Sequence, residues 1–462
     1  MKAIFVCIAC AVVALTSVVF PGAPCFPTLL KLAGVAFIAF CTLRKVIGRS
    51  VEAEYILLGA WTFVSVGLLV NVWYYTTCSG GSVSAPVLVN DDASLAWRRC
   101  LEALNGQISP RVSMTRSGYG SLLALLSWPG PPDIVSLLAF SELFVLLAIV
   151  FTGGIALRLS GSEAPAHVAP AAMLMIAMVS YFLQTGTILV KDACVCAVMA
   201  SAMYAVAGLR DRVRGSDCVV LAVAILTGGL VRPNLMPLLG GGLLFFAAGM
   251  KRRCFAVTAM AVALCAGLYC INKITGSAPE LLGEDTNTLV EIYSGKERLR
   301  SYNDVMGDYS SLPLWKMVLR LPVSLALQYI TPLPWAFARD SVFGPANSWA
   351  HFSLPWYALG GLILYCMLFI IKQLPPPMMK MLIYGIGLWT VTALMTGGTI
   401  SRYCLPWLPI LVPAAAWAWQ NGCRRYRTFK IWYVCYSAAM IVAIAAAFMI
   451  LHRYNPGGWN AQ

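Results

Sequence analysis

The sequence predicts an all-α membrane protein, a polytopic bundle of about thirteen transmembrane helices. Both the amino-acid composition and the hydropathy pattern support this prediction. Of its 462 residues, 60% are hydrophobic and 11% are charged, whereas soluble domains carry about 25% charged residues. The mean hydropathy is +0.76, and one soluble core of this length could not bury so much apolar surface. The apolar residues also come in blocks of about 17–25, the length that crosses roughly 30 Å of hydrocarbon.

The chain 1–462 is expected to form a single transmembrane domain. The expected spans cover approximately residues 3–20, 27–42, 55–75, 132–157, 167–186, 188–209, 218–231, 234–250, 254–271, 354–372, 381–396, 403–419 and 431–451. The first span follows Lys2 and has a signal peptide as its alternative. Because no small-x-small cleavage site follows it, we keep it as a span.

Basic residues predict the orientation, since short loops rich in Lys and Arg face the cytoplasm. With a cytoplasmic N-terminus, about half of the 33 Lys and Arg fall in short cytoplasmic loops. These residues are Lys2, Arg44, Lys45, Arg49, Arg158, Arg210, Arg212, Arg214, Lys251, Arg252, Arg253, Lys372, Lys380, Arg424, Arg425, Arg427 and Lys430. We therefore expect a plasma (inner) membrane protein with a non-cytoplasmic C-terminus. The net charge of +14 is then explained by basic residues that set the orientation of the helices in the membrane. No nucleic-acid partner is expected.

Two long segments, about 76–131 and 272–353, are expected on the non-cytoplasmic side, each with short interfacial helices. The first holds an amphipathic stretch near 97–104, and the second closes with a proline-punctuated apolar stretch at 312–335. Most of the 16 cysteines lie in apolar runs. A Cys78–Cys100 bridge is compatible with this topology, but spacing alone does not establish it.

Several charged residues do not fit an anchoring role, and the topology brings them all to the non-cytoplasmic side. They are Asp91, Asp92, Lys191, Asp192, Arg232 and Arg402. Ionisable groups near membrane depth are costly, so they usually have partners or a function. Each also has a structural explanation: the arginines could snorkel to the interface, the Lys191–Asp192 pair could neutralise itself, and Asp91–Asp92 could be a solvated turn or a helix N-cap.

Carboxylates and cations at one membrane face suit sugar transfer from a lipid-linked phosphate donor. A carboxylate can accept the proton of a sugar hydroxyl or hold a divalent metal. Arginine and lysine can stabilise the charge that grows on a departing phosphate. A single displacement of this kind would invert the anomeric centre.

Five segments resemble motifs of the GT-C superfamily of polytopic glycosyltransferases, which includes protein mannosyltransferase-like and aminoarabinose transferase-like branches. They are Asp91–Asp92 in VNDDASLAW, 117–123 (SGYGSLL), 190–193 (VKDA), 230–233 (LVRP), and 402–406 (RYCLP) with Pro409. The resemblance covers roughly residues 55–420. Two features depart from the family pattern: the acidic loop follows the third span rather than the first, and no soluble domain follows the last span.

The resemblance implies a role for each site residue. Asp91 or Asp92 would be the catalytic base or the ligand of a divalent metal, and no other cofactor is implied. Arg232, Arg402 and Lys191 would contact the donor phosphate. Asp192, Tyr119 and Tyr403 would support them.

These roles predict a membrane glycosyltransferase. Its donor would be a polyprenyl-phosphate sugar, and its acceptor a glycan, a lipid or a protein. Two alternatives stay open: a surface-polysaccharide polymerase or ligase, because fold does not determine the substrate, and a transporter or flippase, which would show inverted repeats and midplane charges.

Overall fold

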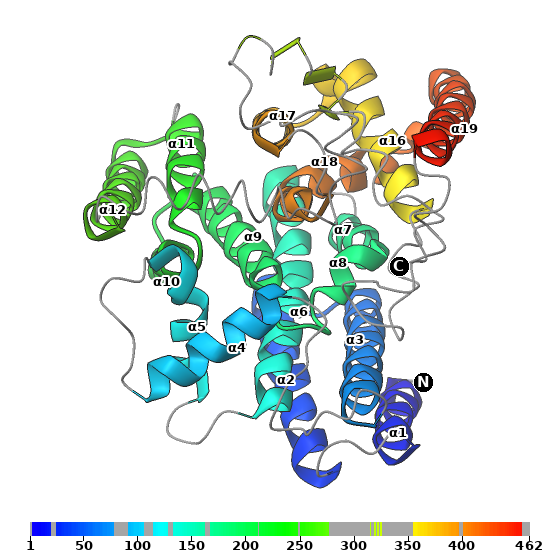
Figure 1. The fold of residues 1–462 in the computed structure, drawn as a ribbon. Helices are drawn as coiled ribbons and strands as arrows, with labels where there is room; N and C mark the ends of the chain where they lie inside the picture. The colour runs from blue at the N-terminus through cyan, green and yellow to red at the C-terminus, as the bar shows by residue number, and fades with distance from the viewer. Residues whose placement is uncertain are drawn as a thin grey trace.

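The structure, a computed structural model, is helical with no strand in the part of the chain that it describes (Figure 1). It describes residues 2–19, 25–77, 91–105, 114–127, 133–161, 167–210, 212–247, 250–276, 315, 318–319, 321–322, 324–325, 354–396 and 401–454. Within these ranges the backbone alone is described at 2–5, 25, 74–77, 91–95, 114–117, 272–276, 394–396, 401–403, 447–448 and 450–454.

Each of the thirteen expected spans coincides with helical structure. The α-helices are α1 (Lys2–Val19), α2 (Cys25–Val46), α3 (Val51–Thr77), α4 (Asp91–Leu104), α5 (Met114–Ser127), α6 (Ile134–Ser160), α7 (Val168–Ala177), α8 (Ser180–Gln184), α9 (Lys191–Leu209), α10 (Gly215–Val231), α11 (Met236–Ala247), α12 (Arg252–Gly276), α16 (Leu354–Phe369), α17 (Pro376–Thr396), α18 (Leu408–Gln420) and α19 (Arg427–Tyr454). The short 3-10 helices are η2 (Pro233–Leu235), η5 (Ile371–Gln373), η6 (Ser401–Trp407) and η7 (Cys423–Arg425).

Six of the described helices are long and apolar enough to cross a membrane, which makes the chain a membrane protein. They are Phe26–Val46, Val51–Trp73, Ile134–Ser160, Lys191–Leu209, Arg252–Ile271 and Arg427–Ala446. Six further apolar helices in the described part are shorter than a full span, among them Val168–Ala177 and Leu354–Phe369. Each of the thirteen expected segments thus contains helix in its described residues, and six of them have the length and composition of a membrane span.

Helices α6 and α9 form the centre of the bundle. They pack against each other, and α2, α3 and α7 pack against α6 while α10 packs against α9. Figure 1 shows α1 and α3 (blue) on one side of this centre and α10–α12 (green) on the other. The apolar window of α9 is 89% buried inside the protein, whereas that of α19 is 17% buried. The exposed apolar faces of the outer helices suit contact with lipid.

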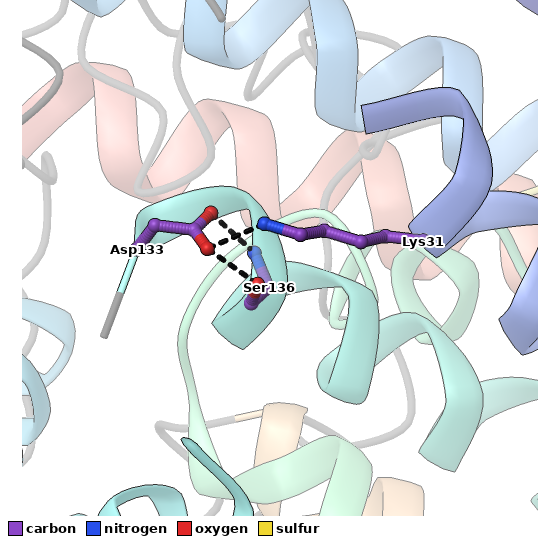
Figure 2. Close-up of polar contacts among 3 residues, drawn as sticks. All are labelled: Lys31, Asp133 and Ser136. Atoms are coloured by element: carbon purple, nitrogen blue, oxygen red, sulfur yellow. Dashed lines mark hydrogen bonds and ion pairs between the residues drawn. The ribbon is translucent and has the colours of Figure 1, made fainter. Parts of the chain in front are cut away.

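Ion pairs between helices test the expected division of the chain into two membrane sides. On the expected outer side, Lys31 of α2 meets Asp133 at 2.5 Å, and Figure 2 shows the Lys31 side chain reaching the start of α6. The other described pairs between helices are Arg232–Asp192 on the same side, and Arg44–Glu54, Arg158–Asp217 and His167–Glu52 on the expected cytoplasmic side. Every pair joins residues that the sequence prediction puts on one side. Which side faces the cytoplasm stays a prediction.

The first expected outer segment contains two helices, α4 and α5, which pack against each other. Cys100 lies fully buried there and is a free thiol, so it forms no bridge to Cys78. Burial raises the pKa of Cys100 to about 11, although a hydrogen bond with Ser127 lowers it. This thiol is therefore protonated at neutral pH. Most of the second outer segment, including most of 312–335, lies outside the described residues.

Candidate functional site: the start of α9 and the end of α10

A break in the helical structure positions the start of α9. The expected span 167–186 is not one helix, because α7 ends at Ala177 and α8 at Gln184. Thr185 and Thr187 turn their hydroxyls back onto the carbonyls of Phe182 and Gln184, at 2.7 and 2.9 Å. Such bonds and the β-branched side chains weaken a helix. We call the buried non-helical segment 185–190 the α8–α9 break.

The α8–α9 break is held between α3 and α6. Asn71 of α3 donates from its Nδ2 to the carbonyl and the hydroxyl of Thr187, both at 3.3 Å. A Cβ at Gly186 would lie 2.8 Å from Val64 and 3.2 Å from Val145. Only a glycine fits this space without displacing its neighbours. These close contacts fix the backbone of the break, and with it the position at which α9 begins, at Lys191.

Helix α9 begins with Lys191 and Asp192. Val190, the N-cap, is extended and offers no side-chain cap. Asp192 is an acidic residue in the first turn, where a helix N-terminus favours negative charge. The residue is only 3% exposed, whereas Lys191 is half-buried.

Arg232 closes α10 and faces this helix start. It is the C-cap residue with φ −150° and ψ 76°, and its backbone N–H donates to the carbonyl of Gly228 at 2.8 Å. Pro233 opens η2 and cannot continue the α-helix, because it lacks an N–H. The sequence Arg232-Pro233 thus ends α10 and leaves the arginine side chain beside α9.

Arg232 and Asp192 form an ion pair at contact distance. Arg232 Nη1 lies 3.9 Å from Asp192 Oδ1, with side chains that are 30% and 4% exposed. This separation exceeds hydrogen-bond length. The guanidinium is thus anchored near a buried carboxylate while part of it stays exposed, as an anion-binding group must be.

Tyr119 belongs to the same region and is held by two close helix contacts. A Cβ on Gly118 would lie 1.8 Å from the carbonyl oxygen of Leu230 in α10, and one on Gly120 would lie 2.4 Å from the Cβ of Arg99 in α4. Between them, the Tyr119 hydroxyl lies 3.4 Å from Ser141 Oγ of α6. Tyr119 is 5% exposed. The two glycines of the Gly-Tyr-Gly sequence therefore allow α5 to pack closely against α4 and against the end of α10.

Arg402 and Tyr403 lie in η6, which packs against α9 and α17. Trp407 fixes its end, because its Nε1 donates to the Thr392 hydroxyl at 2.8 Å. Cys404 and Leu405 are buried. The η6 backbone thus lies along α9, and the side chains of Arg402 and Tyr403 lie outside the described ones.

Asp91 and Asp92 are the first two residues of α4, which packs on α5. They stand in the first helical turn, where negative charge is favourable. Their side chains are not among the described ones, so the proposed base and metal-ligand roles lie outside what the structure describes. The described side chains contain no group of three or more His, Cys, Asp or Glu able to hold a metal ion.

Glu142, which lies within α6, is not among the site residues predicted from the sequence. It is fully buried, and its Oε1 accepts a 2.7 Å hydrogen bond from the Ser65 hydroxyl of α3. A signal was available, because Glu142 is the sole acidic residue in the expected span 132–157 other than Asp133 at its edge. Intramembrane carboxyls of this kind commonly mark function.

Comparison with known proteins gives no relative: no family, no curated protein and no solved structure matches this chain.

Proposed function

We propose that this protein is a membrane glycosyltransferase that takes a sugar from a polyprenyl-phosphate donor. The observation that carries the proposal is the Arg232–Asp192 ion pair where the end of α10 meets the start of α9, whose first residue is Lys191. A partly exposed guanidinium is a group that binds a phosphate at a membrane surface, and a lysine ammonium is another. The GT-C-like order of the sequence motifs supports the same proposal.

The proposed reaction is one displacement at the anomeric carbon. The acceptor hydroxyl oxygen forms a bond to that carbon while the bond to the donor phosphate oxygen breaks. The hydroxyl proton passes to Asp91 or Asp92, and the polyprenyl phosphate leaves with the bonding electron pair. Arg232, Lys191 and Arg402 stabilise the charge on the leaving phosphate.

The proposed setting is the plasma (inner) membrane, with the site on the non-cytoplasmic face. The N-terminus is placed in the cytoplasm and the C-terminus outside, which requires an odd number of spans such as thirteen. The same-side ion pairs support this division of residues between two faces. A divalent metal held by Asp91 and Asp92 belongs to the proposal, and chelation by EDTA tests it.

A transfer assay tests the proposal. Purified protein in nanodiscs is given a panel of radiolabelled polyprenyl-phosphate monosaccharides together with glycan, lipid and peptide acceptors. The double change Asp91→Asn and Asp92→Asn should abolish transfer, and Glu102→Gln in the same helix should not. Full activity in the double variant would reject the catalytic role. Transfer from pyrophosphate-linked oligosaccharides alone would favour a polymerase or ligase instead.

One observation favours a second candidate, a transporter or flippase. Glu142 is a buried carboxyl inside a spanning helix, one turn before Val145, which lies beside Gly186 of the α8–α9 break. Interrupted helices and intramembrane charges are typical of transporters. Movement of a labelled polyprenyl-phosphate sugar across proteoliposomes that contain no acceptor would support this candidate.

A further inference from the structure

Glu142 lies deep inside the membrane-spanning part of the protein. It is the ninth residue of α6, whose bounds are Ile134–Ser160. A rise of 1.5 Å per residue puts it about 12 Å from the start of this helix and about 27 Å from its end. Its relative exposure is 0%. The carboxyl is therefore within the depth of the hydrocarbon core and is shielded from lipid by neighbouring helices.

The two carboxyl oxygens of Glu142 have different surroundings. Oε1 accepts the 2.7 Å hydrogen bond from Ser65. Oε2 is buried and has no hydrogen-bond partner among the described residues. Buried polar atoms nearly always have a partner, and an unmatched carboxylate oxygen is a place where a proton or another cation can bind and neutralise the charge.

No described cation compensates this carboxyl. The helices that pack against α6 are α2, α3, α5, α7, α9, α17 and α18. Their titratable side chains among the described ones are Lys31, Cys41, Arg44 and Lys45 of α2, Glu52, Glu54 and Tyr55 of α3, Tyr119 of α5, Lys191, Asp192, Cys194, Cys196 and Tyr204 of α9, and Lys380 and Tyr384 of α17. In the described part, none of them forms an ion pair or hydrogen bond with Glu142.

The α8–α9 break packs against the turns of α3 and α6 that carry Ser65 and Glu142. Gly186 packs against Val64, the neighbour of Ser65, and against Val145, which is one helical turn after Glu142. Non-helical backbone at membrane depth is tolerated where it is buried in protein or lines a polar cavity. Carbonyls of such a segment are the groups that complete the coordination of small cations in other membrane proteins.

An ionised carboxylate buried alone in apolar surroundings is too costly to persist. We propose that Glu142 is the binding site of a monovalent cation, either a proton or Na⁺, with Ser65 as its hydrogen-bonding partner. A single positive charge neutralises the carboxylate, whereas a divalent ion would leave an uncompensated charge of its own. Oxygen ligands such as this carboxylate and hydroxyl suit a hard cation. The proposal uses none of the residues of the sugar-transfer site and stands independently of it.

Infrared spectroscopy of the purified protein in nanodiscs tests this site. In the first series the pH is varied in choline chloride buffer without sodium. In the second series NaCl replaces choline chloride at the same ionic strength. In sodium-free buffer at neutral pH we expect the C=O band of a protonated carboxyl, absent in Glu142→Gln and shifted in Ser65→Ala. The matched control is Glu52→Gln, an exposed carboxyl at the start of α3, which should leave the band intact.

The series with NaCl distinguishes binding of a proton from binding of Na⁺. If NaCl leaves the protonated band in place, the site binds a proton. If NaCl replaces the band with that of a carboxylate and raises the unfolding temperature of the wild type but not of Glu142→Gln, the site binds Na⁺. An ionised Glu142 in sodium-free buffer at neutral pH, with stability indifferent to Na⁺, would overturn the proposal. Because Ser65→Ala keeps the carboxyl, its band shift remains decisive even if Glu142→Gln fails to fold.

Discussion

Arg232 Nη1 lies 3.9 Å from Asp192 Oδ1, which ties the C-cap residue of α10 to the first turn of α9. Each residue stands where a helix ends or begins, because Pro233 stops α10 and the α8–α9 break precedes Lys191. The carboxylate is buried and the guanidinium is partly exposed. In the proposed function, the buried carboxylate holds the Arg232 guanidinium in place, and the exposed part of the guanidinium can meet a lipid-borne phosphate.

The close contacts of α5 predict a strong effect of small substitutions. Gly118→Ala puts a methyl group onto the Leu230 carbonyl, so α5 and the end of α10 must separate. Overpacking of this kind costs about 1–3 kcal/mol or more. We expect a clearly lower unfolding temperature in detergent. Gly241→Ala in α11, where nothing lies within 4 Å of the added Cβ, should be nearly neutral. Equal stabilities of the two variants would contradict the packing of α5.

On the expected cytoplasmic side of the bundle, we expect the loss of one ion pair to lower the stability of the protein strongly. Arg158 of α6 contacts Asp217 of α10 at 2.9 Å, donates to the carbonyl of Tyr204 in α9 at 2.7 Å, and lies over the Tyr204 ring at 3.5 Å. The Asp217 side chain is 1% exposed. Removal of one partner of a buried pair costs about 3–5 kcal/mol, because the other charge is left uncompensated.

We therefore expect Arg158→Ala to destabilise the protein far more than Lys31→Ala. The Lys31 and Asp133 side chains are 35% and 45% exposed, and such pairs contribute roughly 1 kcal/mol or less. Chemical unfolding of the two variants in the same detergent makes the comparison. A Lys31→Ala protein as unstable as Arg158→Ala would show that burial does not decide these energies.

The Lys31–Asp133 pair also predicts a pH dependence. Burial alone would raise the pKa of Asp133, but hydrogen bonds from Lys31 and from the hydroxyl and backbone N–H of Ser136 outweigh it and lower this pKa below its ordinary value of 3.8. A lowered pKa stabilises the folded state above the unfolded-state value, and this contribution is lost as pH falls through the folded value.

The comparison of wild type with Asp133→Asn measures this effect, since asparagine keeps the N-cap hydrogen bond and removes the charge. The stability difference should be constant near neutral pH and shrink below about pH 4. A difference that grows on acidification would mean that Asp133 is not held in its charged form.

Helix positions could be predicted from the sequence because each apolar block carries its own signal. The α8–α9 break could not, since it depends on contacts of Gly186 and Thr187 with distant helices. Glu142 was missed for a related reason: one acid barely alters the hydropathy of a long apolar segment. Its partner Ser65 is 77 residues away in the chain.

The sidedness of the charged residues could also be predicted, because it follows from counting spans. That prediction groups Asp192 with Arg232 and Lys31 with Asp133, as the structure does. Their actual pairing could not be foreseen, since it depends on which helices are neighbours. Asp91 and Asp92 were expected in a loop or at an N-cap, and they begin α4.

Binding of polyprenyl phosphate to the purified protein in nanodiscs tests the central claim most directly, because it needs no knowledge of the sugar. Polyprenyl phosphate should bind more tightly than the uncharged polyprenol. Arg232→Ala should weaken binding of the phosphate roughly 10–100-fold, the effect of losing a charge-assisted contact. Arg212→Ala, an exposed arginine on the expected cytoplasmic side, should leave binding unchanged. Equal binding of the phosphate and the alcohol, or full binding by Arg232→Ala, would contradict the proposed donor site.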